Sequence, residues 1–333
     1  MTRRIALLCL ALSMPALAQT TLNGAGATFP YPMYSKWFSE YHKAHSDIEI
    51  NYQSIGSGGG IRQVLAGTVD FGASDGPMSD AQLAEAKIKI LHIPTVLGAV
   101  VPAYNVSGLS GELRFSPETI ANICLGKISN WNDKAIAEDN QGVKLPDRPI
   151  ILVHRSDGSG TNYIFTDYLS KVSSEWKQRV GKGTSVSWPV GLGAKGNEGV
   201  AGMIRQMDGA FGYVELIYAV QNKIPYAAIR NSAGSWLKGS LEGATAAAAS
   251  VKDMPADFRV SITNAPGKEA YPISSFTWLL IPVQSKDPTK GKILVDFLQW
   301  MLDNGETMTT QLDYAPLPEN VAAKVAQAIK QVH

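Results

Sequence analysis

Short apolar runs alternate along the chain with stretches in which apolar residues recur every three or four positions. Residues 31–41 place aromatic side chains at the spacing of a helix face, and residues 48–53 alternate between apolar and polar side chains as a strand does. The order of strand, glycine-rich turn and helix recurs at 150–169 and at 186–207. Strands that alternate with helices in this way predict an α/β architecture with mostly parallel sheets.

The pattern predicts the following strands, with Pro94 separating the third from the fourth: 48–53, 69–76, 88–93, 98–104, 150–153, 186–190, 211–214 and 275–282. It predicts helices starting at Tyr31 and Ser116 and further helices over 61–65, 79–83, 162–169, 201–207, 216–220, 290–302 and 319–332. Residues 231–257 follow neither period clearly. One group of strand–turn–helix units precedes residue 100 and another follows residue 150, so two lobes are expected, with a ligand at the carboxyl ends of their strands.

The stretch 155–161 joins a predicted buried strand to a predicted helix. Its sequence, Arg-Ser-Asp-Gly-Ser-Gly-Thr, supplies hydroxyls, small residues and one guanidinium. Free N–H groups at a helix start, together with about half a positive charge from the helix dipole, form an anion site. Asp157 lies in the same turn, so this site must combine an anion with a carboxylate.

Two further glycine-rich turns, 24–30 and 56–60, also stand at predicted helix starts. Each of the three turns carries at least one hydroxyl: Thr28, Ser57, and Ser159 with Thr161. Three such turns in one chain favour a cradle of backbone N–H groups and hydroxyls that binds an anion.

Asp75 and Asp157 can both be interpreted simply as helix caps. A sharper hypothesis is that Asp157 orients Arg155 through an ion pair, while Asp75 accepts a hydrogen bond from the ligand. An ionised carboxylate only accepts hydrogen bonds, so it can face only an anion that still carries a proton. Phosphate carries a proton near neutral pH and sulfate does not, and a buried acceptor left unpaired can discriminate by roughly 10⁴.

Residues 1–18 are predicted to be a secretory signal peptide. Arg3 and Arg4 precede a short apolar run, and Ala-Leu-Ala at 16–18 matches a cleavage site, so the chain is expected to be exported as a soluble protein. Removing these two arginines from 30 basic side chains leaves 28 against 29 acidic ones, which argues against binding nucleic acid or a membrane surface through bulk charge. Cys9 would leave with the signal, so Cys124 would have no partner for an internal disulfide.

Nucleotide-binding motifs are absent or weak. The sequence contains no G-x-x-x-x-G-K-[ST], so nucleotide hydrolysis lacks its usual lysine. A G-x-G-x-x-G at 191–196, with Glu215 further along, could be a dinucleotide fingerprint. Pro189 interrupts the strand before it, however, and a helix-capping turn is the favoured interpretation.

Catalytic and metal-binding patterns are equally weak. There is no G-x-S-x-G nucleophile elbow. His154 is near Ser159 in sequence and could hint at nucleophilic catalysis, but closeness in sequence does not place a base beside a nucleophile. His42 and His45 could form a metal pair, yet they have no cysteine or acidic company and are interpreted as surface residues.

In this order behind a signal peptide, these stretches resemble the phosphate-binding protein of the bacterial high-affinity phosphate ABC transporter. The resemblance covers nearly the whole mature chain. It is carried by NGAGATFP at 23–30, GSGGG at 56–60, DFGASD at 70–75, RSDGSGT at 155–161, PVGLG at 189–193 and LDYA at 312–315.

The resemblance implies a type II periplasmic-binding-protein-like fold, with two α/β lobes joined by a hinge and the ligand in the cleft between them. It implies a lobe I of residues 19–98 plus 272–333 and a lobe II of residues 99–271. A protein of this family acts in the periplasm, after cleavage that is expected here behind Ala18. It binds inorganic phosphate as a monomer, without catalysis, cofactor, metal or nucleic acid, and delivers it to the permease and ATPase subunits of a phosphate ABC transporter.

The resemblance also implies a role for each residue that matches the family's motifs. Thr28, Phe29 and Ser57 donate hydrogen bonds from the first lobe, where Asp75 accepts the phosphate proton. Arg155 pairs with Asp157 and with the ligand. The helix start of the second lobe donates through Ser159, Gly160 and Thr161.

Two features depart from the family's pattern. Gly58 stands where a second serine is expected, which could loosen the first lobe's turn, and 231–257 is short for the family. Two alternative functions stay open: a secreted phosphate-ester hydrolase that uses Ser159 or Ser57, and a carrier of another tetrahedral oxyanion such as sulfate or molybdate.

Overall fold

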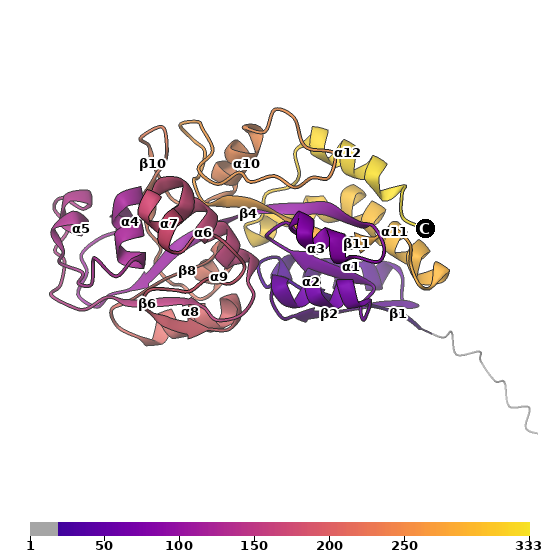
Figure 1. The fold of residues 1–333 in the computed structure, drawn as a ribbon, viewed down its shortest axis with the longest axis horizontal. Helices are drawn as coiled ribbons and strands as arrows, with labels where there is room; N and C mark the ends of the chain where they lie inside the picture. Colours follow the sequence, from indigo (N-terminus) through magenta and orange to yellow (C-terminus); the bar gives the residue numbers. More distant parts are fainter. Residues whose placement is uncertain (1–18) are drawn as a thin grey trace, which may run out of the picture.

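A computed structural model describes residues 19–333, so the predicted signal peptide lies outside the described residues. Eight strands form one sheet in the order β2-β1-β3-β11-β4-β8-β6-β7. The long strand β4 (Ile90–Asn105) passes through its middle (Figure 1). Residues 90–99 of β4 pair with β11 (Ser274–Pro282), and residues 100–105 pair with β8 (Ala210–Glu215). One strand therefore joins the two halves of the sheet.

The first half of the sheet is built from both ends of the chain. Its other elements are β1 (Thr20–Gly26), α1 (Tyr31–Ala44), β2 (Ile48–Ser54), α2 (Ser57–Ala66), β3 (Phe71–Ser74), α3 (Asp80–Glu85), α11 (Pro288–Asp303), the 3₁₀ helix η1 (Gly305–Leu312) and α12 (Glu319–Ile329). A helix lies where the pattern predicts one at 79–83, and Ser79 caps it with a complete capping box.

The second half and the segments around it come from the middle of the chain. These elements are β5 (Arg114–Phe115), α4 (Pro117–Cys124), α5 (Lys134–Asp139), β6 (Ile151–Arg155), α6 (Gly160–Val172), α7 (Ser174–Arg179), β7 (Leu192–Ala194), α8 (Gly196–Gln206), α9 (Leu216–Gln221), β9 (Ala228–Arg230), β10 (Trp236–Leu237) and α10 (Leu241–Ala249). Strands β10, β9 and β5 form a separate small sheet. The region 231–257, which has no clear sequence period, thus contains β10 and α10.

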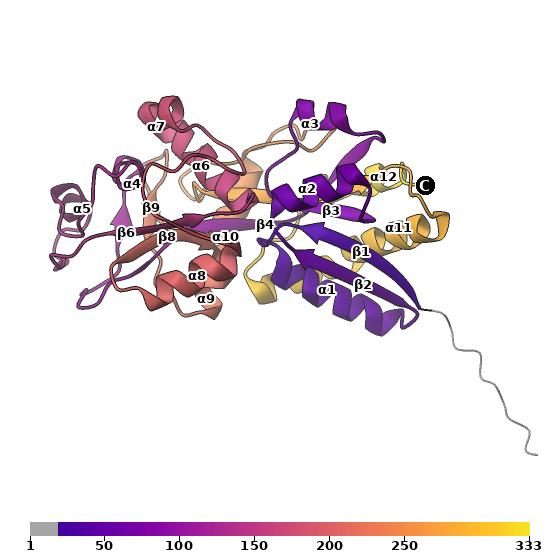
Figure 2. The same ribbon diagram turned by 60° about the horizontal axis from the view of Figure 1, so that its bottom comes forward.

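Helices cover both faces of each half of the large sheet (Figure 2). In the first half α2 packs against β1, β3 and β11, while α1 lies on the opposite face with α11 beside it. In the second half α6 packs against β4 and β8, and α8 packs from the other face against β4, β6 and β8. The starts of α1, α2 and α6 all follow strands of this sheet, as the three glycine-rich turns predict.

The structure corrects the prediction that Pro94 separates two strands. Strand β4 continues through it, because the pairing shifts at this point: Val96 lies opposite Thr277 and Pro94 lies opposite Trp278. Thr95 is the extra residue of this bulge, and its hydroxyl hydrogen-bonds with Tyr34 and donates to the Thr277 carbonyl. A bulge accommodates a proline because the ladder is already interrupted there.

The predicted strand at 186–190 is also wrong. The strand of this unit is β7, which lies a few residues later, and α8 begins at Gly196 and not near residue 201. Pro189 has no N–H for a ladder, and the Trp188 ring stacks on the His154 ring with centroids 5.0 Å apart. The apolar residues at 186–190 therefore do not form a paired strand: Trp188 packs on His154, and Val190 is exposed.

The expectation of mostly parallel pairing holds for the outer strands only. The pairs β1–β2, β1–β3, β6–β7 and β6–β8 are parallel, whereas β3–β11, β11–β4 and β4–β8 are antiparallel. Strand β11 comes from late in the chain and inserts between β3 and β4, antiparallel to both.

Four tryptophans, Trp37, Trp131, Trp176 and Trp278, are buried in the core. Cys124 is buried as well, and burial raises the pKa of its thiol. Within 19–333, no helix combines the length and the apolar character that crossing a membrane requires.

Candidate anion-binding site

The three glycine-rich turns meet at the start of α6. A methyl group added at Gly160, the first residue of α6, would lie 2.4 Å from Asp75 Oδ2 and 2.5 Å from Ser57 Oγ. On the other side of the same helix start, Asn197 Nδ2 donates to Thr28 Oγ1 at 2.8 Å and to Thr161 Oγ1 at 3.0 Å. The starts of α1, α2 and α6 therefore surround one small volume.

In the turn that precedes α1, the backbone carbonyls already have donors, whereas two backbone N–H groups have no acceptor among the described residues. The Tyr218 hydroxyl donates to the Thr28 carbonyl at 2.6 Å, and the Tyr314 hydroxyl donates to the Phe29 carbonyl at 2.5 Å. Thr28 and Phe29 are buried, and within 19–333 no acceptor is present for the backbone N–H of either residue. A buried N–H without an acceptor is costly, so this turn is ready to bind an acceptor.

The first turns of α2 and α6 supply the same kind of donor. Ser57 is the first residue of α2, and Gly160 and Thr161 are the first two of α6. Their backbone N–H groups point out of the helix ends and have no acceptor in the described part of the chain. Ser159 caps α6, with its Oγ accepting from the Asn162 N–H at 3.0 Å, so its own proton is free to donate.

Arg155 and Asp157 form the ion pair that the sequence hypothesis proposes. Arg155 Nε and Nη2 donate to the two carboxylate oxygens of Asp157 at 2.8 and 2.6 Å. Burial raises the pKa of Asp157, but the hydrogen bonds and the charge of Arg155 outweigh burial, and the net shift is downward. Arg155 Nη1 is buried and has no partner within 19–333. The pair therefore fixes the guanidinium and leaves one donor for something else.

Asp75 is almost fully buried, and only one of its two carboxyl oxygens has a hydrogen-bond partner in the described residues. Its Oδ1 accepts from the Thr277 hydroxyl at 2.7 Å, while Oδ2 is buried without a partner among the described residues. Burial raises the pKa of Asp75 to about 7, because the hydrogen bond from Thr277 and the charge of Arg155 offset the cost of desolvation only in part. The carboxyl group can thus be present as acid or as carboxylate near neutral pH.

All nine residues predicted for the site are brought together: Thr28, Phe29, Ser57, Asp75, Arg155, Asp157, Ser159, Gly160 and Thr161. Sequence reasoning did not find Thr277, Asn197 or Tyr218, which contact them. It also did not place Glu215 here, whose backbone N–H donates to Asn197. Thr277 could have been found, because a polar residue in the apolar run 274–282 needs a partner. The other three become recognisable only when their contacts are known.

Gly58 has a structural explanation. Its N–H donates to the Gly158 carbonyl at 2.9 Å, and a methyl group at Gly58 would lie 3.1 Å from the Gly158 Cα. The two turns touch backbone to backbone at this position. The glycine thus permits a close approach between the turns, which is the opposite of the looser turn expected from the sequence.

The motifs considered for other chemistry have structural roles. His154 Nδ1 lies 3.0 Å from the Arg155 carbonyl, and in the described residues no histidine hydrogen-bonds to Ser57 or Ser159. In the G-x-G-x-x-G at 191–196, the Gly196 N–H binds the Asp157 carboxylate at 3.1 Å. His42 hydrogen-bonds to the Ile48 carbonyl, and the described chain has no group of three or more possible metal ligands.

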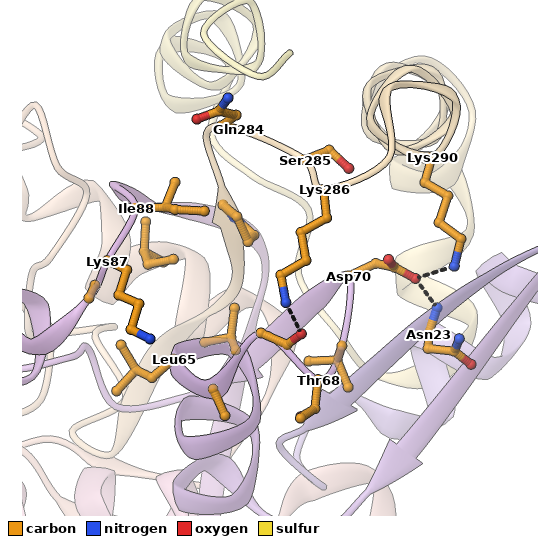
Figure 3. Close-up of a pocket in the computed structure, with 17 residues that line it drawn as sticks. Asn23, Leu65, Thr68, Asp70, Lys87, Ile88, Gln284, Ser285, Lys286 and Lys290 are labelled. Atoms are coloured by element: carbon orange, nitrogen blue, oxygen red, sulfur yellow. Dashed lines mark hydrogen bonds and ion pairs between the residues drawn. The ribbon is translucent and has the colours of Figure 1, made fainter.

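A separate surface pocket of about 350 Å³ lies at the carboxyl end of α2, and none of the nine predicted residues lines it. Figure 3 shows that two of the lysines that line it, Lys286 and Lys290, are bound to groups of the protein. Lys286 Nζ donates to the Gly67 carbonyl at 2.6 Å, and Lys290 Nζ lies 3.2 Å from Asp70 Oδ2. Asp70 also accepts from the Asn23 N–H, so these charges hold the pocket's walls together.

Comparisons with known proteins show the family of this chain. A family model described as a PBP superfamily domain matches residues 14–304. The phosphate-binding protein PstS of Xylella fastidiosa (strain Temecula1) is 48% identical over 316 residues, which cover 93% of this chain and 86% of that protein. The protein of the same name from Pasteurella multocida is 46% identical over 329 residues, or 98% of this chain and 95% of that one.

A solved structure shows the same fold. PfluDING, described as a high affinity periplasmic phosphate-binding protein bound with phosphate, superposes with a TM-score of 0.75 at 22% identity, over 92% of this chain and 93% of that one. The chain therefore belongs to the PBP superfamily and, within it, to the PstS family of phosphate-binding proteins. The predicted fold class, α/β with the two-lobe periplasmic-binding architecture, is confirmed.

Proposed function

We propose that this protein binds inorganic phosphate in the periplasm and delivers it to a phosphate-importing ABC transporter. The observation that carries the proposal is the buried set of unpaired groups: the N–H groups of five residues, Arg155 Nη1 and Asp75 Oδ2. Many donors and a single acceptor match a tetrahedral oxyanion that still carries a proton. Relatives that are 46–48% identical are named phosphate-binding proteins.

The lobes are proposed to be residues 19–98 plus 272–333 and residues 99–271, with phosphate between them. Contacts across this division support a closed arrangement. Gly58 donates to Gly158, Asn197 donates to Thr28, and Arg259 pairs with Asp80. Strand β4 crosses the division at residues 98–99 and β11 begins just after it, so the hinge is proposed to lie where these strands cross.

The remaining functional assignments follow from the family and from the sequence. Residues 1–18 are proposed to be removed on export, after Ala18. The partners are proposed to be the permease and ATPase subunits of a phosphate transporter, reached by a monomer. A binding role without catalysis or a cofactor is proposed from the relatives' names, which describe binding proteins.

Calorimetric titration with phosphate and with sulfate tests the proposal. Hydrogen bonds to charged groups contribute about 1.5–3 kcal/mol each, and micromolar affinity needs roughly 8 kcal/mol, so the donors in the site can support micromolar or tighter phosphate binding. Sulfate should bind at least tenfold more weakly than phosphate near pH 8, where about nine tenths of Asp75 is ionised. Equal affinity for the two anions would contradict the proposal. Turnover of a chromogenic phosphate ester that disappears in Ser159→Ala would instead favour a hydrolase.

A latch, defined here as the contacts of Arg259 in one lobe with Met78 and Asp80 in the other, should slow phosphate release. Arg259 Nη1 donates to the Met78 carbonyl at 2.9 Å and to Asp80 Oδ1 at 2.8 Å, while its Nε binds Asp257. Arg259→Ala is expected to raise the phosphate dissociation rate, because these contacts join the two lobes. The increase should be only about two- to tenfold, because the ion pair with the highly exposed Asp80 is weak.

Stopped-flow release of phosphate into a trap measures this rate. The matched control is Lys134→Ala, which breaks an exposed ion pair with Glu138 inside α5 and should leave the release rate unchanged. If Arg259→Ala and Lys134→Ala release phosphate equally fast, Arg259 is not a latch.

A further inference from the structure

Asn197 is a fully buried residue of the first turn of α8, and its amide links three parts of the site. Nδ2 donates one hydrogen bond to Thr28 Oγ1 at 2.8 Å and one to Thr161 Oγ1 at 3.0 Å. Oδ1 accepts from the Glu215 backbone N–H at 3.0 Å. A backbone N–H can only donate, so this contact fixes which end of the amide is oxygen and which is nitrogen.

The fixed amide determines what the two threonine hydroxyls can do. A hydroxyl has one proton to donate and two lone pairs that accept. Thr28 Oγ1 uses both lone pairs, because it accepts from Asn197 Nδ2 and from the Asn197 backbone N–H at 3.3 Å. Thr161 Oγ1 uses one lone pair for Nδ2. Neither hydroxyl donates to any group in residues 19–333, so both protons are available to a ligand.

We infer that Asn197 is a positioning residue that sets the hydrogen-bond polarity of Thr28 and Thr161, so that both hydroxyls donate to the bound oxyanion. The inference rests on the proposed binding of phosphate and adds to it a residue that makes no contact with the ligand. With the amide in place, the Thr161 hydroxyl is held as a donor within its own lobe, and the Thr28 hydroxyl is oriented when the two lobes meet. Without it, each hydroxyl can rotate and donate elsewhere, and this freedom must be lost on binding.

A double-mutant cycle separates this role from simple structural support. Phosphate affinity is measured by calorimetry for the wild type, Asn197→Ala, Thr161→Val and the double variant, and again with Thr28→Val in place of Thr161→Val. Asn197→Ala is expected to weaken phosphate binding about ten- to a hundredfold in the wild-type background. In either threonine variant its effect should be at least threefold smaller, because one of the hydroxyls it acts through is gone.

A structural role gives a different result. If Asn197 only holds α8 in place, its loss lowers the melting temperature but weakens phosphate binding by the same factor in every background. Asn231→Ala is the matched control: Asn231 is buried, and its amide donates to three loop carbonyls, those of Gly267, Lys268 and Ala270. This variant should be less stable but should bind phosphate within about twofold of the wild type.

Asn197→Asp provides a second variant of almost the same shape, should the alanine variant fail to fold. A carboxylate accepts from both threonine hydroxyls and turns their protons away from the ligand, so phosphate affinity should fall by at least a hundredfold. Part of that loss is charge repulsion, which persists when Thr161 is valine, whereas the part that acts through the Thr161 hydroxyl disappears. Equal penalties in the two backgrounds would overturn the inference. A wild type that binds no phosphate would overturn the proposed function as well, so the two failures are distinguishable.

Discussion

Asp75→Asn is expected to lower the ratio of phosphate to sulfate affinity at pH 9 by about a hundredfold. In the wild type, Oδ2 of Asp75 is buried and has no partner among the described residues. As a carboxylate it needs a proton from the ligand, which phosphate supplies and sulfate does not. An asparagine amide donates to either anion, so the reason for excluding sulfate disappears.

The pKa of Asp75 gives this prediction a pH dependence. Because burial raises this pKa to about 7, the wild-type carboxyl group is protonated in mildly acidic solution and can donate to sulfate. Sulfate affinity should therefore fall about a hundredfold from pH 6 to pH 9 in the wild type and stay nearly constant in Asp75→Asn. Phosphate affinity should change much less over this pH range. Either phosphate or the Asp75 carboxyl group can supply the proton of the hydrogen bond between them.

Titrations with both anions at several pH values provide the measurement. Asp70→Asn is the matched control: Asp70 belongs to the same half of the molecule, but its partners are the Asn23 N–H and Lys290. This variant should keep the wild-type selectivity at every pH. If sulfate affinity in the wild type does not depend on pH, Asp75 does not select the ligand by accepting a hydrogen bond from its proton.

The same group should also affect the stability of the protein without phosphate. A folded-state pKa raised from 3.8 to about 7 stabilises the fold fully below pH 3.8. This contribution declines as the pH rises and is lost above about 7, a change of roughly 4 kcal/mol in the free energy of unfolding. Denaturant titrations should show a smaller decline over this range in Asp75→Asn.

Gly160→Ala is expected to weaken phosphate binding by at least a hundredfold without destabilising the protein. Gly160 starts α6, where alanine is tolerated by the helical backbone. Its methyl group would lie 2.4 Å from Asp75 Oδ2 and 2.6 Å from Asp75 Cβ, so the turn of one lobe could not approach the other. The two halves of the site would then stay apart, and few of the donors could reach one ligand together.

Calorimetry with phosphate and thermal unfolding of the empty protein separate the two effects. Gly202→Ala is the matched control, because Gly202 lies within α8 and a methyl group there meets nothing within 4 Å. Gly202→Ala should bind phosphate like the wild type. Normal affinity in Gly160→Ala would show that the close approach of the two halves is not needed for binding.

Residues that act through their neighbours in sequence were predictable. The 155–161 turn contains its own ion pair, its own cap and its own helix start, so Arg155, Asp157 and Ser159 lie as the sequence indicates. The strand errors at Pro94 and at 186–190 arose where a distant partner decides the pairing. The pairing of β4 with β11 shifts between Thr277 and Trp278, opposite the bulge at Thr95. The Trp188 ring stacks on the ring of His154, which lies on β6.

The sequence by itself determined the chemistry of each turn: which helix starts carry glycines, hydroxyls and charges, and that one acceptor accompanies many donors. These properties depend on backbone preferences within a few residues. The tertiary structure decided which turns meet, how Asn197 orients two hydroxyls, and that the pKa of Asp75 is raised. Contacts and burial depend on residues far apart in the chain, such as Asp75 and Thr277, so a local sequence pattern cannot predict them.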